Sequence, residues 1–207
     1  PELTVSMLSA LRGNPEMALG NAIGSVICDD GLALGLAGIL AAAPIAIFPR
    51  VFKFTAIFLI FIEILTFLFI AFDHTLNRHE GIILVLLFIG YTAVLFYQHK
   101  KGHFKEDIDV EADESVKKLG LPRTFLLFFI GLAGIIFASD FIIVSAQSIA
   151  VSLHIPEAII ALLLVALGTS IPEVATCITA ARKNEGSIAV GNILGADILN
   201  ICWVAGA

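Results

Sequence analysis

The stretch Gly168-Thr169-Ser170-Ile171-Pro172-Glu173 interrupts a long apolar segment, and the motif Gly191-Asn192-Ile193-Leu194-Gly195-Ala196 follows it. The chain opens on Pro1-Glu2 and then reaches the similar motif Gly20-Asn21-Ala22-Ile23-Gly24-Ser25. In both places the asparagine lies 19 positions after the glutamate, and the copies align without a gap at an offset of 171 residues. The sequence therefore contains a repeat that places a carboxylate, an amide and several glycines among apolar residues.

The composition is that of a protein that crosses a membrane several times. Apolar residues make up 58% of the chain and charged residues 14%, whereas a soluble domain has about 25% charged residues. A spanning helix needs about 20 mostly apolar residues. The predicted spans, complete or partial, cover about residues 1–11, 17–43, 54–72, 81–97, 124–151, 156–181 and 188–207. We therefore expect an all-α polytopic membrane protein and, because both ends fall inside patterned segments, a fragment of a longer chain.

The long polar stretch at about 98–122 mixes acidic residues with lysines, which predicts a solvated connector between two halves, 1–97 and 123–207. If successive loops alternate sides, ten of the twelve Lys and Arg residues fall on the side of this connector, which is then cytoplasmic. The helices that carry Glu2 and Glu173 are five crossings apart, so we expect them to be antiparallel. The halves are therefore predicted to be inverted repeats, truncated at the N-terminus and C-terminus respectively, as in many secondary transporters.

The second copy combines a helix break with oxygen ligands. Pro172 has no N–H, and its ring clashes with the carbonyl four residues earlier. An unsatisfied backbone group in lipid costs several kcal/mol, so protein, water or an ion must satisfy the freed carbonyls. Those carbonyls, the Thr169 and Ser170 hydroxyls and the Glu173 carboxylate are hard ligands. Inversion would bring Glu2 beside Glu173, where two carboxylates repel unless one is protonated or a cation lies between them. The ligand types suit Ca²⁺ rather than zinc or copper.

The polar residues near the glycine motifs extend this candidate site. The glycines have the small-xxx-small spacing of closely packed membrane helices, and packing alone would explain them. Packing does not explain the amides beside them, Asn21 and Asn192, or the acid and amide at the equivalent positions Asp29 and Asn200. Ser25 precedes Asp29 by four residues, so both can face one cavity.

These two copies resemble the inverted α-repeats of the calcium/cation antiporter superfamily, in particular its sodium/calcium exchanger branch. The resemblance covers the whole chain and implies ten helices in two inverted halves of five, of which this chain would hold part of the second through part of the eighth. It implies that Glu2, Glu173 and the Thr169 carbonyl bind Ca²⁺. The other site residues it implies are the sodium ligands Ser25, Ser170 and the Ala166 carbonyl, and the lining residues Asp29 and Asn200.

The chain also departs from the family pattern. Ala196 stands where the family commonly has serine, and the polar pair Asp29 and Asn200 is reversed relative to many exchangers. These departures leave the coupling ion and its stoichiometry open. Proton-coupled relatives typically carry glutamate where this chain has Gly24 and Gly195, which favours sodium.

We therefore expect a secondary antiporter that exchanges Ca²⁺ for Na⁺ by alternating access, rather than an enzyme. The alternatives are a Ca²⁺/H⁺ or K⁺-dependent exchanger of the same superfamily and, in another class, a cation channel. We expect no organic cofactor and no nucleic acid, small cations and the lipid bilayer as partners, and compatibility with a monomer in a bacterial or archaeal plasma membrane. The roles of Glu63, Asp140 and Asp197, acids inside predicted spans, stay open.

Overall fold

The computed structural model describes residues 1–45, 47, 49–73, 75–101 and 121–206. All regular elements in these ranges are helical, as the sequence predicts. In chain order they are α1 (Glu2–Leu11), α2 (Pro15–Cys28), the π-helical turn η1 (Asp29–Ala33), α3 (Leu34–Leu40), α4 (Pro49–Asp73), α5 (Arg78–Lys100), α7 (Leu121–Leu153), α8 (Glu157–Ile160), the π-helical turn η3 (Ala161–Val165), α9 (Ala166–Thr169), α10 (Ile171–Arg182), α11 (Gly186–Leu199) and the π-helical turn η4 (Asn200–Val204).

The predicted spans correspond to observed helices. Five helical segments in the described ranges are long and apolar enough to cross a membrane, and a sixth span is formed if the bent pair Glu157–Thr169 and Ile171–Arg182 is counted as one. The short apolar helix α1 matches the expected partial span. Nearly all of the predicted acidic connector, residues 102–120, lies outside the described residues, so the division into two halves stays a prediction.

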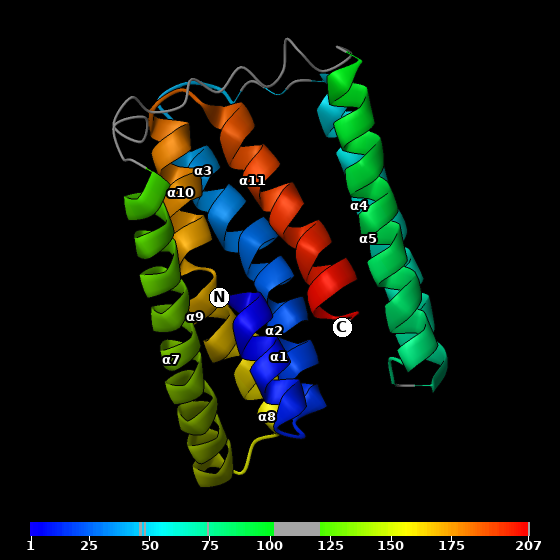
Figure 1. Cartoon of the computed structure of the whole chain (residues 1–207), viewed down its shortest axis with the longest axis vertical. Helices are drawn as coiled ribbons and strands as arrows, with labels where there is room; N and C mark the ends of the chain where they lie inside the picture. Colours follow the sequence, from blue (N-terminus) through cyan, green and yellow to red (C-terminus); the bar gives the residue numbers. More distant parts are fainter. Residues whose placement is uncertain (46, 48, 74, 102–120, 207) are drawn as a thin grey trace.

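The two copies of the repeat have opposite directions. In Figure 1, α1 starts near the middle of the molecule and runs toward the end opposite to the one that α10 approaches. The helices α2 and α11 have bounds that differ by the repeat offset of 171 residues at both ends, and so do η1 and η4. The backbone turns into each second helix through a residue of positive φ at equivalent positions, Gly13 (83°) and Asn184 (61°). The structure thus contains the inverted pair that the span count predicts.

Three apolar clusters hold the helices around this pair. One joins α1, α2, α7 and the α8–η3 segment, another joins η1, α3, α10 and α11, and the third joins α2, α4, α5, α11 and η4. Close approach between α2 and the α8–α9 segment depends on glycine, because a Cβ on Gly20 or Gly24 would collide with the carbonyl oxygen of Ala158 or Leu162. The tight packing places α2 directly against the broken span.

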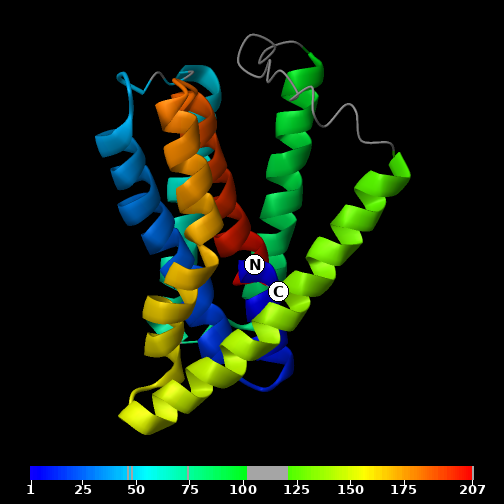
Figure 2. The ribbon, with the colours of Figure 1, turned by 90° about the vertical axis from the view of Figure 1, so that its left-hand side faces the viewer.

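The long helix α7 crosses the bundle obliquely, as Figure 2 shows. Most of its large apolar side chains are exposed, which is expected of a helix that faces lipid. Asp140 in α7 forms an ion pair with Arg12, the residue that follows α1. A structural role in fastening α7 to α1 accounts for this acid, which interrupts a predicted span.

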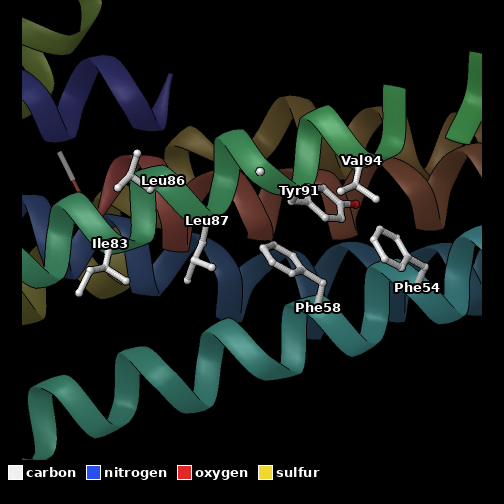
Figure 3. A pocket seen from close by; sticks show the side chains of 8 residues that line it. Phe54, Phe58, Ile83, Leu86, Leu87, Tyr91 and Val94 are labelled. Atoms are coloured by element: carbon white, nitrogen blue, oxygen red, sulfur yellow. The ribbon is translucent and has the colours of Figure 1, made fainter. Parts of the chain in front are cut away.

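Helices α4 and α5 form a pair joined by aromatic stacking. The Tyr91 ring stacks on Phe54 and Phe58, with ring centroids 5.8 and 4.4 Å away, and its hydroxyl lies 3.0 Å from the Thr55 hydroxyl. Figure 3 shows these rings beside a shallow apolar crevice along the seam between the two helices. The crevice has almost no polar lining, so we assign it to the lipid-facing surface rather than to a site.

Candidate cation-binding site

The broken span places oxygen atoms inside the bundle. Helix α9 ends at Thr169, Ser170 forms the break with φ −82° and ψ 0°, and α10 continues at an angle of 44°. Pro172 is the second residue of α10, a position where its missing N–H is tolerated. Glu173 follows in the first turn of α10, where a carboxylate interacts favourably with the helix dipole. The predicted break is therefore present, and it positions Glu173.

Glu2 occupies the equivalent position at the first turn of α1. Its side chain is buried, and its Oε1 atom has no hydrogen-bond partner among the described residues. Glu173 is partly buried, and its Oε2 atom likewise lacks a partner there. The two carboxylates are close enough to interact electrostatically. The two glutamates of the inverted repeat therefore lie within electrostatic range of each other, and their joint binding of a cation stays a prediction.

Asn21 links the two copies through a buried network. Its amide nitrogen donates to the Ser6 hydroxyl at 3.0 Å and, at 3.4 Å, to the Glu2 carbonyl. Its amide oxygen accepts from the Thr169 hydroxyl at 3.3 Å, and Thr169 also lies 3.4 Å from the Ser25 hydroxyl. All of these hydrogen bonds are buried. The network fixes α2 against α1, which carries Glu2, and against α9, which ends at the break before Glu173.

The side chains of Asp29 and Ser170 place further polar oxygens in the interior of the bundle. Asp29 and Ser170 are fully or almost fully buried, and their side chains lie close enough to interact. Neither Asp29 Oδ1 nor Ser170 Oγ makes a hydrogen bond of normal geometry within the described ranges. Asn200, the repeat equivalent of Asp29, is also buried. Buried polar groups are normally satisfied, so unpartnered oxygens on Glu2, Asp29, Ser170 and Glu173 call for an explanation. A bound cation supplies one, because the carboxylate oxygens and the Ser170 hydroxyl oxygen all have lone pairs that can coordinate it.

The donor set determines which cation could bind. Within the described residues no group of three or more His, Cys, Asp or Glu is arranged to hold a metal ion by itself. A cation near Glu2 and Glu173 would therefore also need hydroxyl, amide or carbonyl oxygens or water. Mixed oxygen ligands of this kind suit hard ions such as Ca²⁺. The Ala166 carbonyl accepts the Ser170 N–H at 2.9 Å and lies 3.1 Å from the Thr169 hydroxyl, whose one hydrogen it shares with the Asn21 amide oxygen.

One residue proposed for the site from the sequence lies elsewhere. Asn192 is exposed and lines a groove between α11 and the α4–α5 pair. It shares this groove with Gly191 and Gly195, where an added Cβ atom would have no described atom within 4 Å. The other nine residues proposed for the site are buried or, in the case of Glu173, partly buried.

The structure also adds a feature that the sequence analysis missed. The helices α2 and α11 both change to π-helical geometry, beginning at Asp29 and Asn200. Single π-helical turns inside α-helices are frequent at functional sites because the extra residue disrupts the regular hydrogen-bond ladder. No residue pattern in these apolar stretches announces the change, although the equivalence of Asp29 and Asn200 points to the same two positions.

The fold and site define a class: a multi-pass integral membrane protein with inverted repeats and buried oxygen atoms near a helix break, an arrangement found in secondary transporters. The family model for the sodium/calcium exchanger protein family matches residues 1–97 and 123–207, and the chain belongs to this family. This family is one of membrane transporters and not of enzymes.

Individual relatives agree with this assignment. The chain is 31% identical over 97% of its length to an uncharacterised membrane protein of Methanocaldococcus jannaschii, covering 63% of that protein. It is 29% identical over its full length to the sodium/calcium exchanger MaX1 of Methanosarcina acetivorans, covering 68% of it. A structure of the sodium-calcium exchanger NCX_Mj soaked with Na⁺ and Sr²⁺ matches with a TM-score of 0.66 and 31% identity, over all of this chain and 64% of that one. The chain thus spans slightly less than two thirds of NCX_Mj and of the Methanocaldococcus protein.

Proposed function

We propose that the full chain containing this sequence exchanges Ca²⁺ for Na⁺ across a bacterial or archaeal plasma membrane. Ca²⁺ binds between Glu2 and Glu173, and Na⁺ ions occupy overlapping oxygens that include the Ser25 and Ser170 hydroxyls. Asp29 and Asn200 line the centre between the two repeats. The observation that carries this proposal is the set of buried oxygens without donors on Glu2, Asp29, Ser170 and Glu173.

Charge compensation explains why such a site would exchange ions rather than leak them. A dication between two carboxylates cancels their charge, and Na⁺ ions on the same oxygens do so in its place. An empty site would carry uncompensated charges through a medium of low dielectric constant, which is costly. Only a loaded site would then rearrange readily between the two sides, by rocking of helix bundles around it.

The rival functions make different demands on the counter-ion. A Ca²⁺/H⁺ exchanger would take up Ca²⁺ in response to a pH gradient without Na⁺, and a K⁺-dependent exchanger would need K⁺ as well. A channel would pass cations without any counter-ion gradient. The glycines at Gly24 and Gly195, where proton-coupled relatives typically carry glutamate, favour Na⁺.

The test measures ⁴⁵Ca²⁺ uptake by the full chain in proteoliposomes. We expect an outward Na⁺ gradient to drive uptake, and a pH gradient in Na⁺-free buffer to drive none. Glu173→Gln should reduce Na⁺-driven uptake to that of protein-free vesicles, because one of the two central charges is lost. Glu16→Gln is the matched control, since Glu16 is exposed at the start of α2 and should tolerate the change. Uptake that persists in Glu173→Gln would refute the site, and uptake driven by the pH gradient alone would refute Na⁺ coupling.

A further inference from the structure

A second group of acids comes from η1, α4 and α11. Asp197 in α11 is fully buried, and neither of its carboxylate oxygens has a hydrogen-bond partner among the described residues. The carboxyl group of Asp30, in η1, lies within hydrogen-bonding reach of Asp197. Glu63, in the middle of α4, is partly buried and interacts electrostatically with both. Three helices thus contribute one acid each to the same region.

Packing holds these acids in place. Val26, Leu59, Ile62 and Ile198 belong to one buried cluster that joins α2, α4 and α11. Asp30 lies four residues after Val26, and Glu63 four residues after Leu59, so each acid is one turn beyond a residue of the shared core. Asp197 directly precedes Ile198. The acids therefore sit at the edge of a fixed apolar interface rather than on mobile surface segments.

The charges of this group need compensation. No Lys, Arg or His within the described ranges forms an ion pair with Asp30, Glu63 or Asp197. Two ionised carboxylates in contact inside a spanning segment repel each other and lose their hydration. The side chains recorded as interacting with the Asp197 carboxyl, those of Asp30, Asp29 and Glu63, are all acids, so this region attracts a positive ion.

The position of the pair suggests its role. Asp30 is exposed, whereas Asp197 is buried one turn before Asn200 at the central site. We infer that Asp30 and Asp197, with Glu63 as a nearby third charge, form a second Ca²⁺ site through which the ion passes between solvent and the central site. One dication balances the two contacting carboxylates, and water completes the coordination of Ca²⁺, which takes six to eight oxygens. The role in transport depends on the proposed exchange, whereas the binding of Ca²⁺ does not.

Binding is tested first, by equilibrium dialysis of the full chain against ⁴⁵Ca²⁺. The double variant Glu2→Gln/Glu173→Gln removes the central carboxylates and should still bind one Ca²⁺ per chain with low affinity. Adding Asp197→Asn should abolish this remaining binding. Adding Asp30→Asn should abolish it too, and this change disturbs the fold less because Asp30 is exposed. Adding Asp140→Asn, the same chemical change at the ion pair between α1 and α7, should leave it intact.

The results separate the two proposals. A double variant that binds no Ca²⁺ overturns the second site. So does a double variant whose remaining Ca²⁺ binding is kept after both Asp197→Asn and Asp30→Asn are added. A double variant that binds as much Ca²⁺ as the unaltered chain overturns the central site and leaves the second one standing. Thermal unfolding of Asp197→Asn in Ca²⁺-free buffer should show equal or higher stability, because an unpartnered buried charge is removed.

Transport supplies the remaining measurement. Asp197→Asn should raise the KM for Ca²⁺ roughly tenfold while changing kcat much less, since it removes a ligand on the path to the central site and not at the centre. A fall in kcat at unchanged KM would assign Asp197 to the rearrangement of the loaded transporter and would overturn the role in ion access.

Discussion

The two glycine–asparagine motifs have the same local structure and opposite surroundings. Gly20, Asn21 and Gly24 in α2 are fully buried against the α8–α9 segment, whereas Gly191, Asn192 and Gly195 in α11 are exposed along the groove beside α4 and α5. The bounds of the two helices nevertheless agree at both ends when the repeat offset is applied. The two copies therefore share the helix, its π-helical turn and its limits, while the burial of each copy depends on which helices lie against it.

The largest expected difference between the copies concerns Gly24 and Gly195. A Cβ on Gly24 would overlap the Leu162 carbonyl oxygen and lie 2.7 Å from the Ala166 Cβ, and the backbone atom cannot yield easily. Gly24→Ala should therefore lower the free energy of unfolding by about 1–3 kcal/mol, as overpacking does. Gly195→Ala meets no described atom and should raise it by up to about 1 kcal/mol, because alanine favours a helix over glycine.

Thermal unfolding of both variants of the 207-residue chain in detergent measures this contrast. The expected result is a lower midpoint for Gly24→Ala and an equal or higher one for Gly195→Ala. Equal destabilisation by both changes would mean that the groove at Gly195 is closed in solution, and would remove the distinction between the copies.

The second expected difference concerns the central pair Asp29 and Asn200, which occupy equivalent positions but differ in charge. Asp29→Asn removes one of three acids near the centre and should raise the KM for Ca²⁺ roughly tenfold in vesicle uptake, the scale of a lost supporting charge. The exchanged variant Asp29→Asn/Asn200→Asp restores the total charge on the other repeat and should recover most of the affinity. If the exchanged variant has the same raised KM for Ca²⁺ as Asp29→Asn alone, the site is asymmetric at this position.

The sequence predicts best what is decided over short distances. The spans follow from apolar length, and the break near Ser170 follows from Pro172, which removes one hydrogen bond wherever the helix lies. The antiparallel arrangement of Glu2 and Glu173 also follows, because it needs only a count of crossings. The position of Asn192 could not be predicted in this way, since it depends on the packing of α4 and α5 beside α11. The network from Asn21 to Thr169 joins residues 148 positions apart and depends equally on tertiary contacts.

The smallest expected difference concerns Ser6 in α1 and Cys177 in α10. Each donates to a carbonyl of the following helix, Ser6 to Ala18 at 3.1 Å and Cys177 to Ala189 at 3.7 Å, and these positions are equivalent in the repeat. Ser6 also accepts from the Asn21 amide.

Exchanging these two side chains tests how much the first copy depends on its hydroxyl. Ser6→Cys should cost about 1 kcal/mol because it weakens a buried hydrogen bond to Asn21, whereas Cys177→Ser keeps a donor to the Ala189 carbonyl and should change stability by less. In an Asn21→Ala background the cost of Ser6→Cys should largely disappear, which a double-mutant cycle of unfolding midpoints detects. A cost that persists in that background would assign the effect of Ser6 to helix packing and not to the polar network, and the two copies would then differ only in what covers them.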